Sequence, residues 1–153
     1  MPELKLTEAL DDMVARLVAI AGLGGVALVH VLQLPDAFAA VDYLGILFII
    51  AIVLALGLAA MLTRMSDERI WAATGALPAL VLIGYILSRT SGLPGFTDDI
   101  GEWSEPLGLV SMVFEGLLVC LSATVLATQH TTVERVPSAR RDAGAGRAFP
   151  QGG

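Results

Sequence analysis

The chain has 153 residues, of which 56% are hydrophobic, and a mean hydropathy of +0.76. Ordinary soluble domains are about half apolar even when glycine is counted, so this composition indicates a protein of the lipid bilayer. The formal charge of −6 argues against nucleic acid as a partner, because binding phosphates requires a basic surface.

Four segments are almost free of charge, and each approaches or exceeds the ~18 to 20 residues needed to cross about 30 Å of hydrocarbon. They cover residues 17–34, 43–62, 70–88 and 106–128. The connections after the first and second segments are about eight and seven residues long, which forces neighbouring helices to run antiparallel. We therefore predict an all-α fold, an antiparallel bundle of four transmembrane helices formed by residues 1–128.

The residues before the first span predict an amphipathic lead-in helix. Thr7 can cap this helix, and Leu6, Leu10, Met13 and Leu17 follow at spacings of four, three and four. Such a helix is expected to lie at the membrane interface and to continue into the first span. The start is acidic and no cleavage site follows a short apolar core, so the first span is interpreted as a retained helix.

Small residues recur at four-residue spacing in every span, a pattern that allows close approach of helices in lipid. These pairs and rows are Ala21 and Gly25; Ala51, Ala55 and Ala59; Gly75 and Ala79; Gly116 and Cys120. The spans are therefore expected to pack as one bundle.

The segment SGLPGFTDDIGEWSEPLG, residues 91–108, is a polar insert between the third and fourth spans. Gly92, Pro94 and Gly95 predict a turn, and Pro106 with Glu105 before it suits a helix start. Neither feature requires the three further carboxylates, which are candidates for binding a partner or a cation: Asp98, Asp99 and Glu102. A solvated rim is the alternative interpretation, and whether a metal binds is left open because the spacing matches no EF-hand loop.

Glu115 is the most informative polar residue inside a span. It is the tenth residue from Pro106 and so lies roughly 15 Å along the helix, near the bilayer centre. Ser111 shares its face at a spacing of four. An acid at this depth is expected to be neutral and hydrogen-bonded in the resting protein, either as a structural group or as a proton or cation site.

His30 and Tyr85 lie near the same ends of the first and third spans. Their similar depths allow a hydrogen bond between them, and a bound water or ligand would be needed to connect His30 to the deeper Glu115. Together with Ser111 and Glu115 they form the predicted intramembrane polar site.

Lys and Arg are unevenly distributed. Of the nine in the chain, only Arg89 lies outside the N-terminal segment, the 63–69 connection and the residues after 128. Because positive residues stay in the cytoplasm, we expect both termini to be cytoplasmic and the protein to be a multi-pass protein of the bacterial inner (plasma) membrane. Residues 129–153 lack periodicity and core-forming side chains and are predicted to be a disordered cytoplasmic tail.

Several stretches carry a family resemblance: VHVLQLPDAF, YLGILF, YILSRTSGLPGF and EPLGLVSMVFEGLLV. Over residues 21–127 the chain resembles a group of small bacterial four-helix membrane proteins with a GLPGF and EPLG loop and no established activity. The resemblance implies the four-helix architecture and no specific function.

The sequence shows no catalytic or cofactor-binding constellation such as C-x-x-C, H-E-x-x-H, G-x-S-x-G or a phosphate loop. The leading hypothesis is a non-enzymatic membrane protein without a cofactor, an accessory or interaction subunit of a larger membrane complex. The alternative is a small oligomeric transporter, channel or ligand-binding protein that uses Glu115, His30, Tyr85 and the loop carboxylates. Besides the lipid bilayer, the expected partner is another membrane protein or further copies of the chain, and the sequence identifies neither that partner nor any ligand.

Overall fold

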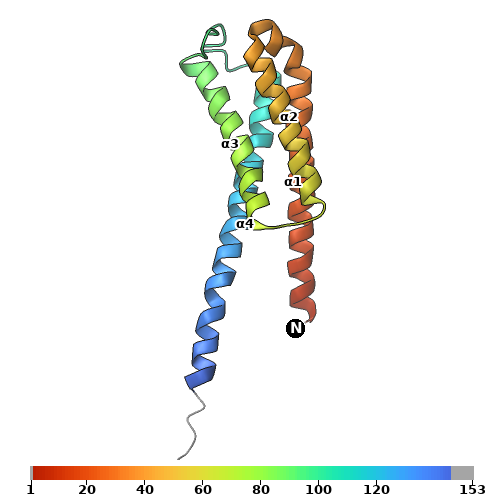
Figure 1. Cartoon of the computed structure of the whole chain (residues 1–153), viewed down its shortest axis with the longest axis vertical. Helices are drawn as coiled ribbons and strands as arrows, with labels where there is room; N and C mark the ends of the chain where they lie inside the picture. The colour runs from red at the N-terminus through yellow and green to blue at the C-terminus, as the bar shows by residue number, and fades with distance from the viewer. Residues whose placement is uncertain (1, 146–153) are drawn as a thin grey trace, which may run out of the picture.

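The computed structural model describes residues 2–145, with side chains described for Thr7 and residues 9–129. This part of the chain is all-helical (Figure 1), with α1 at Pro2–Ala40, α2 at Asp42–Leu62, α3 at Glu68–Thr90 and α4 at Pro106–Ala145. Each helix contains a stretch long and apolar enough to cross a membrane: Ala9–Ala40, Asp42–Leu62, Glu68–Thr90 and Pro106–Gln129. The predicted all-α class and its four apolar helices are confirmed.

The four stretches keep most of their side chains on the outside of the protein. At most 33% of the most apolar window of any of them is buried. Large apolar side chains such as Val53, Leu80 and Val113 are more than 60% exposed. A surface of this kind suits hydrocarbon, as expected of a multi-pass membrane protein.

The connection between α1 and α2 is shorter than predicted. The sequence places about eight residues there, but α1 continues through Pro35 to Ala40 and only Val41 separates the helices. Val41 is extended, with φ −164° and ψ 136°, and reverses the chain in one residue. The extension is stabilised by packing, because Phe38 lies against Gly45 of α2, where an added side-chain carbon would be 2.5 Å from the ring.

Polar contacts connect α1 to the segment where α2 meets α3. The Arg16 Nε donates a hydrogen bond to the Leu62 carbonyl at 2.8 Å. The fully buried Trp71 donates from Nε1 to the Ser66 hydroxyl at 2.8 Å, and Ser66 donates to Asp12 at 2.9 Å. The first helix is thereby joined to both ends of the α2–α3 connection.

The helix α1 packs on α2 and α4, and α3 packs chiefly on α4. The core contains buried side chains from all four helices, including Leu23, Val26, Leu62, Trp71 and Leu118. Two of the predicted small residues allow close helix contacts, since a carbon added at Gly25 would lie 2.7 Å from the Phe114 ring and one at Gly75 would lie 2.9 Å from the Ser122 Cβ. The predicted pair on α4 does not act in this way, because Gly116 has no such neighbour within 4 Å and Cys120 is exposed.

The helix α4 also continues past the predicted fourth span. It runs to Ala145, so residues 129–145 are helical where the sequence predicts disorder, while residues 146–153 of the predicted tail lie outside the described residues. Elongation of a helix that already exists needs no new nucleus, which explains how a polar segment can continue it.

Candidate functional site

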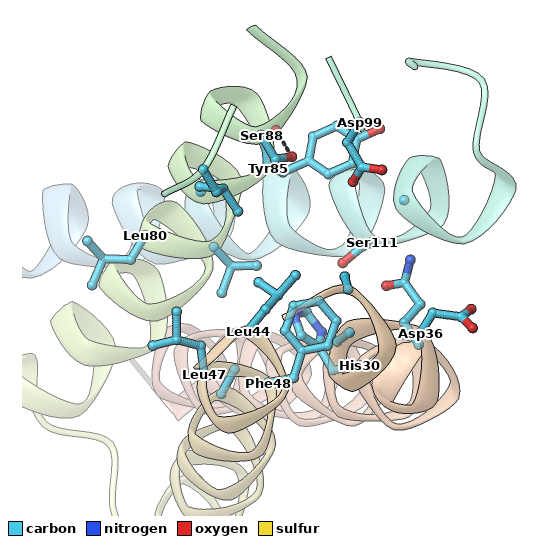
Figure 2. Close-up of a pocket in the computed structure, with 18 of the residues that line it drawn as sticks. His30, Asp36, Leu44, Leu47, Phe48, Leu80, Tyr85, Ser88, Asp99 and Ser111 are labelled. Atoms are coloured by element: carbon cyan, nitrogen blue, oxygen red, sulfur yellow. Dashed lines mark hydrogen bonds between the residues drawn. The ribbon is translucent and has the colours of Figure 1, made fainter. Parts of the chain in front are cut away.

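A cavity of about 480 Å³ is lined by residues of all four helices and lies near the long loop, residues 91–105. This volume is within the usual range of small-molecule sites, roughly 300 to 1,000 Å³. Figure 2 shows apolar side chains of α2 and α3, among them Leu44, Phe48 and Leu80, on the wall of this cavity. Leu47 of α2 and Leu80 of α3 line it and are 52% and 67% exposed, so the cavity is open on the side between these two helices.

Glu115 and Ser111 of α4 form the deepest polar part of the cavity. Glu115 is only 1% exposed, and the Ser111 hydroxyl donates a hydrogen bond to its Oε1 at 2.6 Å. The other oxygen, Oε2, is buried and has no hydrogen-bond partner in the described structure. Buried polar atoms are nearly always paired, and of the five unpartnered ones among the described residues, three line this cavity, on Tyr85, Arg89 and Glu115.

His30 of α1 faces the same cavity. It is buried, and its Nδ1 lies 2.9 Å from the Val26 carbonyl. A carbonyl can only accept, so Nδ1 carries a proton and donates this hydrogen bond. The ring packs edge-to-face on Phe48 of α2, with centroids 4.8 Å apart, which fixes its orientation.

Tyr85 of α3 also lines the cavity, but it does not form the hydrogen bond to His30 that its depth allows. Its hydroxyl is buried and has no partner in the described structure. The ring lies against Gly108 of α4, where an added carbon would be 2.7 Å from Cε2. The structure therefore places all four residues of the predicted intramembrane site on one cavity, with a direct bond only between Ser111 and Glu115.

The sequence did not predict a charged cluster at the end of the cavity nearest the long loop. The cluster is formed by Arg89, Asp99, Glu105 and Gln33. The Arg89 side chain is 4% exposed and makes two ion pairs, at 2.5 Å to Asp99 and 2.6 Å to Glu105. Gln33 of α1 donates to the second oxygen of Glu105 at 2.7 Å. Glu105 therefore has a role beyond the helix start assigned to it, because its carboxylate joins α1 and α3. The sequence contained one signal for this cluster, because Arg89 is the one Lys or Arg near the several acids of the long loop.

The structure does not bring the three loop carboxylates together, and their predicted role in binding a partner or a cation stays a prediction. Asp99 pairs with Arg89, and Asp98 is exposed. Glu102 accepts hydrogen bonds from the Ser104 hydroxyl and amide, which hold the pKa of its carboxyl below the usual range. Within the described residues no three His, Cys, Asp or Glu side chains are grouped so as to hold a metal ion.

The cavity thus combines apolar walls, the buried and incompletely paired acid Glu115, and a charged cluster at the end near the long loop. This arrangement can bind a lipid-soluble molecule that carries one polar or charged group. No protein family, curated protein or solved structure matches this chain, so the resemblance to small four-helix bacterial membrane proteins stays a prediction.

Proposed function

We propose that this protein is a non-enzymatic integral membrane protein that binds a small lipid-soluble ligand in the cavity that opens between α2 and α3. The observation that carries the proposal is the unpartnered Glu115 Oε2 in an apolar-walled cavity that opens to the side. A buried polar atom without a partner costs about 1 to 3 kcal/mol, and a ligand that supplies the missing partner would recover this cost. The apolar wall would thus favour binding of the apolar part of the ligand, and Glu115 would favour binding of its polar group.

The shape of the cavity supports entry from the membrane. Leu47 and Leu80 stand at its side opening and are strongly exposed, so in a bilayer they would contact acyl chains. At the end of the cavity near the long loop, Arg89 and its partners form a charged cluster. A ligand dissolved in lipid would reach Glu115 between α2 and α3 without crossing this charged cluster.

We further propose that both termini lie in the cytoplasm of a bacterial cell and that the long loop lies on the outer side of the inner membrane. The distribution of Lys and Arg supports this orientation, because only Arg89 of the nine lies on the loop side. The cavity would then open toward the outer leaflet.

The role as an accessory subunit stays a prediction. The exposed apolar faces of the helices suit lipid and suit a membrane-protein partner or a second copy equally well. The ligand-binding alternative is favoured here because the cavity and its unpartnered acid need an explanation that a partner on the outer surface does not provide.

The test uses the full chain in nanodiscs and triphenylphosphine oxide, a neutral lipid-soluble probe whose oxygen accepts hydrogen bonds. Binding is measured by equilibrium dialysis against protein-free nanodiscs. The blocking variant is Gly84→Phe, since Gly84 lines the cavity and an added carbon there has no neighbour within 4 Å. The control is Gly57→Phe, which has equal space but lies outside the cavity lining.

We expect saturable binding to the wild type, a loss of about tenfold or more in Gly84→Phe, and wild-type affinity in Gly57→Phe. Equal binding by both variants, or partitioning that never saturates, would contradict the proposal.

A further inference from the structure

We infer that the ligand class of this cavity is a lipophilic cation, such as a substituted ammonium or phosphonium, with the Glu115 carboxylate as its counter-ion. This inference rests on the proposed function and adds the sign of the charge that the cavity selects.

The charges of the cavity lining favour a cation. Four carboxyl groups line it, on Asp36, Asp99, Glu105 and Glu115, against one guanidinium, that of Arg89, and the imidazole of His30. Arg89 is already committed to Asp99 and Glu105. Within the described residues, neither Asp36 nor Glu115 pairs with a basic side chain. The Arg89 Nε has no hydrogen-bond partner there, but both terminal nitrogens of this guanidinium are paired, so the carboxyl groups of the lining outnumber it.

Because Glu115 is buried, its carboxyl group favours ligands that carry a positive charge. An anionic ligand, including the phosphate of a lipid headgroup, gains no ion pair from an acid that is neutral at rest. It would repel the ionised acid in a region of low dielectric, where Coulomb energies are several times larger than in water. A cation there supplies the counter-charge that allows the buried acid to ionise. The unpartnered Oε2 is the atom left available for this contact, since Oε1 accepts from Ser111.

The chemistry of the walls excludes a simple inorganic cation. Ions such as Ca²⁺ need six to eight oxygen ligands, and in the part of the chain that the structure describes no three His, Cys, Asp or Glu side chains are grouped so as to hold a metal ion. The cavity instead presents leucine side chains and the ring of Phe48, while the Tyr85 ring already faces the Arg89 guanidinium. Aromatic faces attract organic cations, and apolar walls attract the substituents of those cations. The cation must therefore carry its own apolar groups.

The test compares three probes of similar size that differ in charge: tetraphenylphosphonium, triphenylphosphine oxide and tetraphenylborate. Each is titrated into wild-type protein in nanodiscs of uncharged phosphatidylcholine, and protein-free nanodiscs provide the subtraction for membrane partitioning. We expect saturable binding of the phosphonium, at an affinity about tenfold or more above that of the borate.

A pair of variants then assigns the selectivity to one residue. Glu115→Gln keeps the shape and a hydrogen-bond donor but cannot ionise, so it should weaken phosphonium binding about tenfold while changing that of the neutral oxide less than about threefold. Glu102→Gln removes an exposed loop carboxylate and should leave both affinities unchanged.

The outcomes separate the two proposals. Equal saturable binding of all three probes, or tighter binding of the borate, would overturn the inference about charge while the cavity remained a binding site. An unchanged phosphonium affinity in folded Glu115→Gln would also overturn it. Saturable binding of none of the probes would refute the proposed function as well. The comparison of probes on the wild type decides the charge selectivity even if the variant does not fold.

Discussion

Arg89→Met tests whether the charged cluster near the long loop stabilises the contacts between the loop, α1 and α3. The substitution keeps an unbranched apolar side chain of similar reach and removes the guanidinium. It breaks the ion pairs to Asp99 and Glu105, and also the contact with Tyr85, whose ring centroid lies 5.0 Å from the guanidinium carbon. The carboxylates of Asp99 and Glu105 then remain close together without a counter-charge.

The expected loss follows from the burial of each group. Removing one partner of a buried ion pair costs about 3 to 5 kcal/mol. The Arg89 side chain is 4% exposed, but those of Asp99 and Glu105 are each 36% exposed, so water partly solvates the carboxylates left behind. We therefore expect the lower end, a loss of about 3 kcal/mol in the free energy of unfolding. Arg89→Lys keeps the charge but not the two-pronged geometry and should lose about half as much.

The measurement is equilibrium unfolding in mixed detergent micelles followed by tryptophan fluorescence. Trp103 of the long loop reports on this region, since its ring packs edge-to-face on Tyr85 with centroids 6.1 Å apart. The matched control is Arg64→Met, at an exposed position of the opposite end. A loss below about 1 kcal/mol in Arg89→Met, or an equal loss in the control, would refute the reasoning.

Two further predictions concern orientation and packing. In a Cys120→Ser background, a cysteine at Thr97 should react with an impermeant maleimide in intact cells and one at Ser66 should not; labelling at Ser66 alone would reverse the proposed orientation. Gly75→Val should reduce the free energy of unfolding by about 1 to 3 kcal/mol, because α3 and α4 can no longer approach closely. Gly57→Val, which meets no neighbour within 4 Å, is the control, and equal losses in the two would show that the helix contact is not the cause.

The spans were predictable from the sequence because a membrane helix is specified locally. In hydrocarbon every backbone amide and carbonyl must be paired within its own segment, so length and hydropathy alone predict four helices. The pairing of Ser111 with Glu115 was predictable for the same reason, since a spacing of four places two side chains on one helix face.

The ends of the helices were less predictable. Hydropathy falls after residue 34, and Pro35 suggests a break, yet α1 continues to Ala40 because the ring of Phe38 packs on Gly45 in the next helix. That stabilisation comes from a contact with another element, and no local pattern encodes it.

The composition and spacing of this sequence determined the number of helices, their apolar surfaces and the position of Glu115 along the fourth helix. Only the tertiary structure decided that Glu115, His30 and Tyr85 line one cavity, and that Arg89 pairs across 16 residues with Glu105, which in turn bonds to Gln33 across 72. The physical reason is that helix formation depends on residues three and four apart in the chain. A cavity instead depends on how side chains of helices far apart in the sequence pack together and leave space between them. The least tightly joined pair of neighbours, α2 and α3, is where that space opens.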